Sequence, residues 1–390
     1  MITHSPIPSQ PHSLLQIALG WFPTSPGGIE RYVYELTHHL AASGDTVELC
    51  GIGLPAPPPD LPFHLTNLAS PTDPIERRLW SARSYFAQRQ LLQPDAINLH
   101  FALYSFPLMQ VLPDDVPLTF TFHGPWAMES QQEGTSKISA FVKQWMEQRV
   151  YRQCDRFIVL SQAFGEILHQ SYKVPWERIH SIPGGVDTAR FQLNLNRQQA
   201  RAQLDLPSDR FILFTPRRLV QRMGIDRLLL ALSQIRSRIP DVFLAIAGKG
   251  AMRSSLEQQV NELGLQNHVR FFGFLPDEQL PIAYQAADLT VIPSQALEGF
   301  GLVLVESLAC GTPVLCTPIG GMPEILHPFA PDLITTSTDA ESIAHHLQSI
   351  LTERIPLPAR TDCQTYAHTH FNWQTIAPQV RSVLLGEKSY

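Results

Sequence analysis

Residues 294–311 read SQALEGFGLVLVESLACG and directly follow a β-branched run that ends at Pro293. A strand, a Gly-rich turn and an apolar helix in this order are typical of a parallel sheet with helices on its faces. The turn predicts a helix that begins near Gly301, with free backbone N–H groups and the positive end of its dipole pointing out of the sheet. Such a helix start is suited to a phosphate group.

The same alternation of short β-branched runs and longer helical segments continues along the whole chain. The expected strands are residues 14–19, 46–51, 63–68, 96–101, 118–122, 157–160 and 179–182 in the first half, and 211–215, 243–247, 269–273, 289–293, 314–317 and 332–335 in the second. This pattern predicts an α/β fold with two Rossmann-like, doubly wound sheets.

A chain of 390 residues is too long for one ordinary core, so we expect two domains. The hinge is predicted at Pro183-Gly184-Gly185 and the polar stretch up to about residue 203, which carries no strand signal. The predicted domains are residues 1–185 and 186–364, followed by a helical tail at 365–390. The sequence leaves open whether that tail packs back on the first domain.

The composition narrows the class of protein. With a net charge of -6 and a pI of about 6.2, no global basic field exists to attract nucleic acid. The five cysteines are scattered, as in a reduced protein. Residues 1–12 are polar and Pro-rich, and no apolar stretch reaches the roughly 20 residues that a membrane span needs. These features predict a cytoplasmic protein.

Two glutamates belong to the Gly-rich segment. Glu306 lies on an apolar helix, so its carboxylate needs a partner, which is either the hydroxyl groups of a ribose or a core arginine. Glu298 lies in the loop before the helix, where it either accepts hydrogen bonds from a bound sugar or is an ordinary solvated acid. The joint spacing and the Gly-Phe-Gly turn favour the ligand-binding interpretation of both.

Three arginines, Arg217, Arg218 and Arg222, follow the strand expected at 211–215. Guanidinium groups at the carboxyl end of a strand can neutralise a diphosphate, because their planar fork matches phosphate oxygens. The alternative is a group of surface arginines. Their place on the same sheet edge as the helix start favours binding.

In the first half, Gly27 and Gly28 lie between a strand and a helix that begins near Ile29, where the backbone can approach a ligand closely. His123 ends the strand at 118–122 on the same edge, as a cleft residue or a structural one. His100 and Ser161 also follow strands, and we give them less weight as cleft contacts.

These residues resemble those of the retaining glycosyltransferases of family 4, which have the GT-B fold, with two Rossmann-like domains facing each other across a cleft. The resemblance extends from the first strand to about Trp373. It rests on the Glu-x(7)-Glu pair Glu298 and Glu306, on ACGTPVLCTPIGGMPEIL at 309–326, on IPGGVD at 182–187, on RLV at 218–220 and on GGIER at 27–31.

The resemblance implies a role for each matching position. Glu306 holds the donor ribose, Glu298 lies beside the donor sugar, and Arg218 binds the diphosphate. Met223 stands where the family usually has a lysine, so we assign that contact provisionally to Arg222. The expected catalytic residues are His123, Arg218 and Glu298, and the expected donor-binding residues are Gly27, Gly28, Arg218, Arg222, Gly299, Phe300, Gly301, Leu302 and Glu306.

The resemblance also implies a nucleotide-diphosphate sugar as donor, retention of anomeric configuration, and a saccharide or lipid-linked acceptor. No two aspartates are two positions apart, so we expect neither a metal nor another cofactor, with arginines neutralising the leaving group instead. The alternatives are a sugar-nucleotide epimerase, a phosphorylase with a pyridoxal-phosphate lysine, and a non-catalytic nucleotide-sugar-binding module of the same fold.

Two segments combine cations with large apolar residues, as helices at a membrane surface do. Residues 74–92 carry four arginines beside Leu79 and Trp80, and residues 136–152 carry Lys137 and Lys143 beside Phe141 and Trp145. Ordinary packed surface helices show the same mixture and remain the favoured alternative. Peripheral contact with the inner membrane face therefore stays open.

Overall fold

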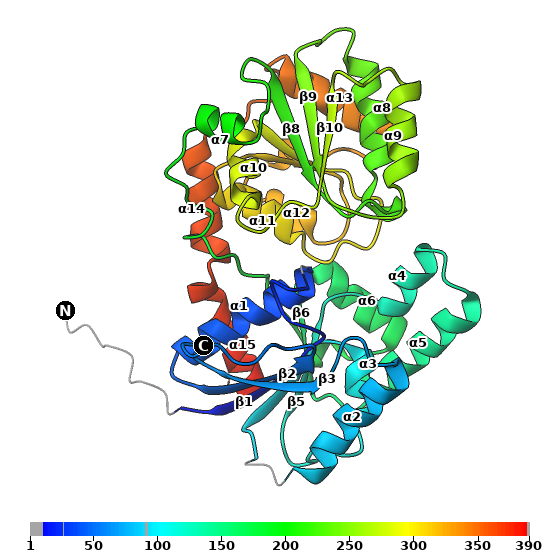
Figure 1. The fold of residues 1–390 in the computed structure, drawn as a ribbon, viewed down its shortest axis with the longest axis vertical. Helices are drawn as coiled ribbons and strands as arrows, with labels where there is room; N and C mark the ends of the chain where they lie inside the picture. Colours follow the sequence, from blue (N-terminus) through cyan, green and yellow to red (C-terminus); the bar gives the residue numbers. More distant parts are fainter. Residues whose placement is uncertain (1–10, 26, 90–92, 388–390) are drawn as a thin grey trace, which may run out of the picture.

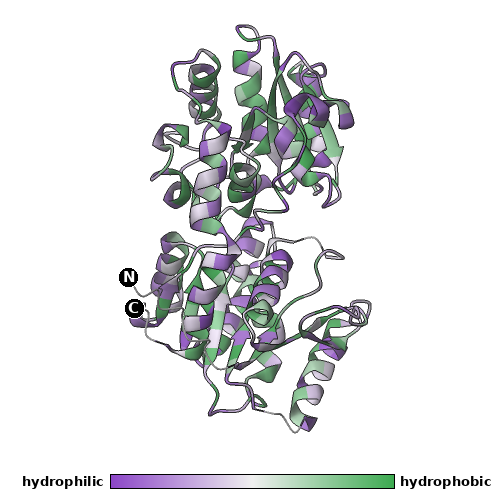
Figure 2. Cartoon of the chain, turned by 90° about the vertical axis from the view of Figure 1, so that its left-hand side faces the viewer, coloured by the Kyte–Doolittle hydropathy of each residue, from purple (hydrophilic) through white to green (hydrophobic). Residues whose placement is uncertain are grey.

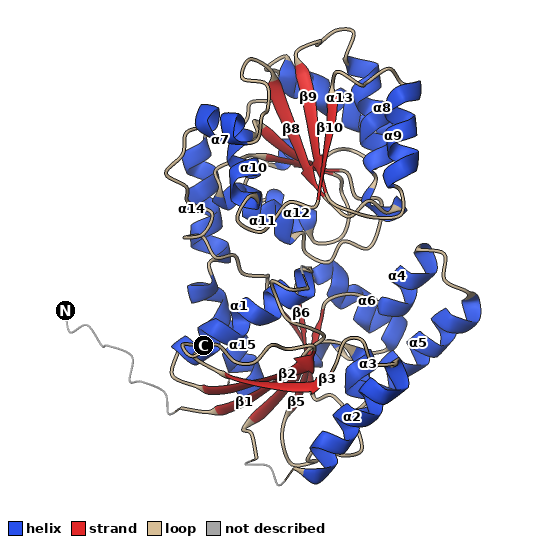
Figure 3. Ribbon diagram, in the orientation of Figure 1, coloured by secondary structure: helices blue, strands red, loops and turns tan. Residues whose placement is uncertain are grey.

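The computed structural model describes residues 11–25, 27–89 and 93–387, and their strands form two separate parallel sheets with helices on both faces of each (Figures 1 and 3). The first sheet has the strand order β3-β2-β1-β4-β5-β6-β7 and the second the order β10-β9-β8-β11-β12. Every ladder in both sheets is parallel. The predicted α/β fold with two doubly wound sheets is confirmed.

The strands of the first sheet are β1 (Ser13–Ile17), β2 (Thr46–Ile52), β3 (His64–Ala69), β4 (Ala96–Leu99), β5 (Leu118–Phe122), β6 (Arg156–Val159) and β7 (Ile179–Ser181). Those of the second are β8 (Phe211–Pro216), β9 (Val242–Ala247), β10 (Val269–Gly273), β11 (Leu289–Ile292) and β12 (Val314–Cys316). The predicted strands match these bounds to within two residues at either end, with one exception.

The exception is the strand expected at residues 332–335, which is wrong. The chain forms a 3-10 turn there, η4 (Pro331–Leu333), and only Ile334 makes an isolated bridge, to Cys316. Pro331 has no N–H group to donate to a ladder, so the β-branched residues that suggested a strand lie beside the sheet edge without extending it.

The helices among the described residues of the first half are α1 (Gly28–Ala42), α2 (Ile75–Gln88), α3 (Ala102–Ser105), α4 (Trp126–Gln132), α5 (Lys137–Tyr151) and α6 (Gln162–Tyr172), with the 3-10 turns η1 (Phe106–Leu108) and η2 (Trp176–Arg178). Those that follow are α7 (Arg197–Gln203), α8 (Ile225–Ile235), α9 (Arg253–Glu262), α10 (Leu280–Ala286), α11 (Leu302–Ala309), α12 (Met322–Leu326), α13 (Ala340–Leu351), α14 (Arg360–Phe371) and α15 (Trp373–Leu385), with η3 (Gln221–Met223).

Apolar runs and amphipathic helices explain why these elements form. All six residues of β9 are buried, as expected for a strand covered on both faces. The helix α8 buries Leu228, Leu229 and Leu232 and packs against α13. Figure 2 shows the strands mainly in the hydrophobic colour, with hydrophilic residues on outer faces of the helices.

The two halves are joined twice by the chain. Residues 182–196 cross from the first sheet to the second, and the junction of α14 and α15 crosses back, so that α15 packs against α1, β4 and β6 (Figure 1). The crossings touch where the amide of Val186 donates to Phe371 O at 2.7 Å. Gly185 is required beside them, because a Cβ there would lie 2.3 Å from the Trp373 ring.

All five cysteines are free and buried, as the sequence predicts. Among the helices that the structure describes, none has both the length and the apolar character to cross a bilayer.

Candidate functional site

The carboxyl ends of both sheets face a cavity of about 450 Å³ between the two halves, within the size range of small-molecule sites. Its walls are Gly27, Gly28, Ile29, Glu30, His123, Glu129 and Leu160 from the first half, and Pro216, Arg217, Arg218, Arg222, Met223, Leu297, Glu298, Gly299, Phe300, Gly301, Leu302 and Val303 from the second. All residues expected to be catalytic or donor-binding, except Glu306, therefore line one cavity.

The Gly-rich turn places the start of α11 at this cavity. Gly301 is the N-cap residue with a φ of 90°, a left-handed conformation that favours glycine. Ser161 Oγ donates to Gly299 O at 2.5 Å, which fastens the turn to the opposite half. Ser161, expected as a minor cleft contact, instead holds the loop that carries the helix start.

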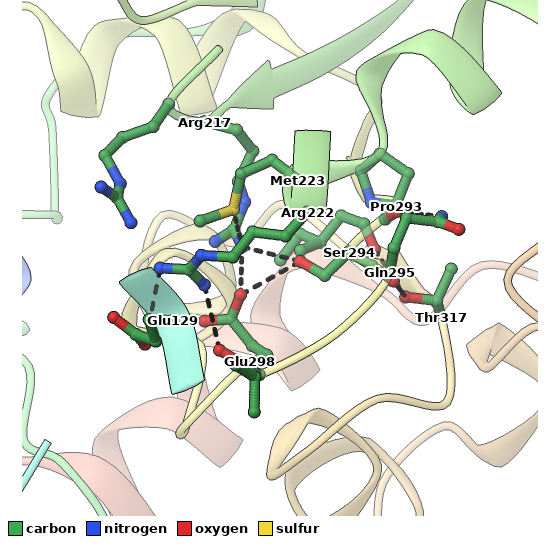
Figure 4. A network of polar contacts seen from close by, with 12 residues as sticks. Glu129, Arg217, Arg222, Met223, Pro293, Ser294, Gln295, Glu298 and Thr317 are labelled. Atoms are coloured by element: carbon green, nitrogen blue, oxygen red, sulfur yellow. Dashed lines mark hydrogen bonds and ion pairs between the residues drawn. The ribbon is translucent and has the colours of Figure 1, made fainter. Parts of the chain in front are cut away.

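Glu298 is bound to Arg217 and is not the free or solvated acid considered above. Nη2 of Arg217 donates to Oε2 of Glu298, and Ser294 Oγ donates to the same oxygen at 3.0 Å (Figure 4). Burial alone would raise the pKa of Glu298, but the charge and hydrogen bonds of Arg217 outweigh it and lower the pKa. Glu298 therefore lines the cavity as a carboxylate with one oxygen engaged.

Arg218 and Arg222 differ in how firmly they are held. The side chain of Arg222 is 8% exposed, and its Nη1 donates to Leu297 O at 3.0 Å. That of Arg218 is 56% exposed. Met223, which replaces the expected lysine, also lines the cavity, and its sulfur accepts from Arg217 Nη2 at 2.8 Å. Arg222 thus lines the cavity where the resemblance places a lysine, although carboxylates of Glu129 and Glu133 contact its guanidinium group.

Glu306 requires a correction, because the structure engages both oxygens that were expected to meet a ribose. Arg31 Nη1 lies 3.2 Å from Oε1, and Tyr284 Oη donates to Oε2 at 2.9 Å. Arg31 also pairs with Asp277. The cation comes from α1 in the other half of the chain, so the alternative of a buried arginine partner is the one found. A ribose can meet Glu306 at the acceptor sites of its carboxylate that Arg31 and Tyr284 leave free, or by displacing one of them.

His123 reaches the cavity from the end of β5 as a neutral imidazole. Its Nε2 shares a hydrogen bond of 3.1 Å with Nδ1 of His100, whose Nε2 contacts Gln16 Oε1 at 2.9 Å. The same His100 Nε2 lies 3.1 Å from Asn98 Nδ2, so His100 is held by two polar side chains of a buried network. Burial lowers the pKa of His123 to about 3. His100 therefore positions the neutral ring of His123 at the cavity.

Gly27 and Gly28 form the opposite wall of the cavity at the start of α1. Gly27 is the N-cap residue, and a Cβ there would collide with the Glu30 carboxylate at 2.1 Å. A Cβ at Gly28 would lie 3.7 Å from Leu302 Cδ1, so the two helix starts approach each other closely. Two sets of free N–H groups thus border the same space.

Three residues in or beside the cavity were missed or left without a role in the sequence. Arg217 was noted only as one of a group, although it is the partner of Glu298. Glu129 and Glu133 of the α4 region approach Arg222 and Arg218 from the other half. Their spacing on a short polar helix carries no signal of a contact nearly ninety positions away.

Two family models match the chain in sequence order. "Glycosyltransferase Family 4" matches residues 26–190, and "Glycosyl transferases group 1" matches residues 196–370. The chain belongs to the family 4, group 1 glycosyltransferases. The gap between the two matches, residues 191–195, lies in the polar stretch that follows Gly185.

Among the curated relatives of this glycosyltransferase is a GDP-mannose-dependent α-(1-6)-phosphatidylinositol monomannoside mannosyltransferase of Mycolicibacterium smegmatis. It is 31% identical over 226 residues, which are 55% of this chain and 58% of that protein. The first relatives found are matched over only about three fifths of their own length.

Solved structures extend the likeness to the whole fold. Sucrose-phosphate synthase of Thermosynechococcus elongatus superposes with a TM-score of 0.78 at 25% identity, over 95% of this chain and 98% of that one. Anabaena Alr3699/HepE in complex with UDP-glucose has a TM-score of 0.76 at 20% identity, over 96% and 100% of the two chains. The second likeness supports the GT-B fold alone.

Proposed function

We propose that this glycosyltransferase moves a hexose-type sugar from a nucleotide-diphosphate sugar to a hydroxyl of a saccharide or lipid-linked acceptor, with retention of configuration and without a metal. The products belong to polysaccharide or glycoconjugate synthesis, on the cytoplasmic side of the membrane. Uridine is the base that the family favours, and guanosine and adenosine are the other candidates.

The observation that carries this proposal is the composition of the 450 Å³ cavity. It combines two helix starts, Gly28 of α1 and Gly301 of α11, with Arg218 and Arg222. Free N–H groups and guanidinium groups are the donors that bind phosphate oxygens. The same space is bordered by His123 and Glu298, which can meet the hydroxyl groups of a sugar held next to that diphosphate.

The proposed reaction takes place on one face of the sugar. The bond between the anomeric carbon and the diphosphate oxygen breaks, and the acceptor hydroxyl oxygen bonds to that carbon from the same side. The acceptor proton passes to the departing phosphate oxygen, so the protein supplies no base. Arg218, Arg222 and the start of α11 stabilise the charge that develops on the leaving diphosphate.

The test uses the purified chain with UDP-, GDP- and ADP-sugars in the presence of a chelator. Without an acceptor, slow hydrolysis should release one nucleoside diphosphate, and NMR of an acceptor product should show the anomeric configuration of the donor. Inversion in the product would disprove retention, and release that needs added Mg²⁺ would disprove metal independence.

The rival functions give different products in the same assay. An epimerase converts the nucleotide sugar without releasing the nucleoside diphosphate. A phosphorylase carries the absorption of a pyridoxal-phosphate Schiff base. A binding module holds the nucleotide without turnover. Loss of hydrolysis in Glu298→Ala and Arg218→Ala, with retention in Glu257→Ala on the outer helix α9, would identify the cavity as the site of turnover.

The outer surface of α5 supports the proposal of a lipid-linked acceptor, because it could contact the membrane that holds such an acceptor. Four large apolar side chains at helical spacing are exposed there: Ile138 at 79%, Phe141 at 69%, Val142 at 47% and Trp145 at 47%. On α2, by contrast, Trp80 is the one large apolar side chain of the described residues that is strongly exposed, and Phe86 is buried. The helix α2 therefore packs as an ordinary surface helix. The rest of its segment, residues 90–92, lies outside the described residues.

The four exposed apolar residues of α5 form a stripe, and the helices that carry and flank it have a net positive charge, opposite in sign to that of the whole chain. The helices α2 and α5 contain the cations Arg77, Arg78, Arg83, Lys137, Lys143 and Arg149 against Glu76 and the buried Glu147, whereas the chain as a whole has a net charge of -6. Arg83, Arg149 and Trp145 border a hollow of about 230 Å³ next to the stripe. Cations beside exposed apolar residues fit a bilayer that contains anionic lipid.

Vesicle flotation tests this membrane contact. The chain should float with phosphatidylglycerol vesicles at low salt and less at high salt, whereas Phe141→Ser with Ile138→Ser should stay in solution. Phe274→Ser is the matched control, because Phe274 is 48% exposed on the other half of the molecule. The contact is disproved if the chain binds no vesicles at either salt concentration, or if the two stripe substitutions leave flotation unchanged.

A further inference from the structure

The helix α4 reaches across the cavity to the arginines of the opposite half. Glu129 Oε1 lies 3.5 Å from Arg222 Nη2, and Glu133 Oε1 lies 3.4 Å from Arg222 Nε and 3.6 Å from Arg218 Nη2. Figure 4 shows Glu129 beside Arg222, with Glu298 on the other side of the guanidinium group. Both arginines of the proposed diphosphate site are therefore in contact with carboxylates of the first domain.

The position of α4 is set by its own domain. It packs along α5, and Lys143 Nζ of α5 donates to Ser130 Oγ at 2.7 Å and lies 4.9 Å from the Trp126 ring centre. The amide of Ala127 donates to the buried Glu147 at 3.4 Å. Because α4 is tied to the first domain and the arginines belong to the second, these ion pairs connect the two domains across the cavity.

The three arginines that line the cavity all have carboxylate partners. Three guanidinium groups, Arg217, Arg218 and Arg222, face the three carboxylates of Glu298, Glu129 and Glu133. A diphosphate adds at least two negative charges to this space. Since like charges repel at contact distance, Glu129 and Glu133 have to move away from the arginines when the diphosphate arrives.

The six groups are not held equally. The Arg217–Glu298 pair is enclosed, with side chains 7% and 12% exposed, so its charges remain paired. The side chains of Glu129 and Glu133 are 27% and 37% exposed, and that of Arg218 is 56% exposed. The Arg218–Glu133 pair is open to water and contributes about 1 kcal/mol or less, so a diphosphate can displace it. The pairs of Arg222 are held more firmly, because its side chain is 8% exposed.

From this arrangement we propose that Glu129 and Glu133 form a carboxylate latch: they occupy the arginines of the empty donor site, hold the two domains together, and are displaced by the donor diphosphate. The proposal rests on the proposed function, since it assigns the diphosphate to Arg218 and Arg222. Burial raises the pKa of Glu129, against the lowering effect of Arg222 and Arg218.

The latch predicts that removal of its charge strengthens donor binding, the opposite of what a donor-contacting residue does. Glu133→Gln and the Glu129→Gln/Glu133→Gln double variant should bind UDP about two- to tenfold more tightly than the unchanged chain. Glu133 is the cleaner position, because it does not line the cavity itself. The Michaelis constant for the donor should fall while kcat does not rise.

The matched control is Glu324→Gln. Glu324 also connects the two halves, because its carboxylate accepts hydrogen bonds from the amides of Gln162 and Ala163 at 2.8 and 2.9 Å. Neither of these hydrogen bonds involves an arginine. It should leave UDP affinity unchanged. Small-angle scattering of the ligand-free proteins gives a second readout, because the latch variants should be more open than the unchanged chain.

The experiment is calorimetric titration of UDP, GDP and ADP into the four proteins at low salt. Tighter binding in both latch variants and not in Glu324→Gln supports the latch. Binding that is equal or weaker in the latch variants overturns the latch and leaves the proposed function intact. If the unchanged chain binds none of the three nucleotides, the proposed donor site fails and the latch fails with it.

Discussion

The two walls of the cavity are built in different ways. The wall from the second domain comes from two continuous segments, 216–223 and 297–303, whose residues share a strand end or a helix start. The wall from the first domain combines one short segment, residues 27–30, with single residues from separate elements: His123, Glu129 and Leu160. Local sequence therefore identifies the wall proposed to bind the diphosphate, whereas the wall proposed to face the sugar and acceptor depends more on tertiary packing.

The largest expected effect concerns Glu298, the centre of the continuous wall. Glu298→Gln removes the charge that neutralises the buried Arg217 and should lower kcat/KM for donor turnover by about 10²- to 10³-fold. The measurement is nucleoside diphosphate release from the donor sugar. Glu257→Gln is the control, since Glu257 pairs with Arg253 on an exposed helix.

Arg218 and Arg222, both in the wall of the second domain, are expected to differ in how much they contribute to nucleotide binding. Arg222→Ala should weaken nucleoside diphosphate binding by about 10- to 100-fold, because Arg222 is enclosed and oriented by Leu297 O. Arg218→Ala should cost several-fold less, because water screens a side chain that is 56% exposed. Calorimetric titration compares them, and a larger loss at Arg218 would reverse the assignment.

The start of α11 can be tested against a second glycine that has nearly the same φ angle. Gly301→Ala and Gly44→Ala both place a side chain at a positive φ, of 90° and 97°, and each should lower the free energy of unfolding by about 1–2 kcal/mol. Gly44 lies outside the cavity, so only Gly301→Ala should also weaken diphosphate binding. Equal nucleotide affinity in the two variants would remove the start of α11 from the site.

The smallest expected effect concerns His123, in the wall of the first domain. It is a change in how the free energy of unfolding depends on pH. Because the pKa of His123 falls to about 3 in the folded chain, the unfolded chain binds more protons between pH 3 and 6.5, and stability rises with pH over that window. His123→Asn should reduce the slope of unfolding free energy against pH by up to about 1.4 kcal/mol per unit. Denaturant unfolding at pH 4, 5 and 6 measures it, and an unchanged slope would mean that His123 takes up its proton in the folded state.

The sequence predicts features that neighbouring residues determine, but not contacts between residues that are far apart in the chain. The strands, the turn before α11 and the arginines after β8 are signalled by neighbouring residues, so they were found. The strand expected at 332–335 failed because Pro331 interrupts it beside a sheet edge. The Arg31–Glu306 and Glu129–Arg222 contacts join residues far apart in the chain, and no local pattern specifies which carboxylate meets which cation.

The central claim is that fixed positive charge and helix starts bind a diphosphate in the 450 Å³ cavity without a metal. Calorimetric titration of the nucleoside diphosphate into the chain with excess chelator tests it most directly, with Arg218→Ala/Arg222→Ala alongside. The account predicts binding of the same affinity with chelator and with added Mg²⁺, and its loss in the double variant. Binding that appears only with Mg²⁺, or that survives removal of both arginines, would contradict it.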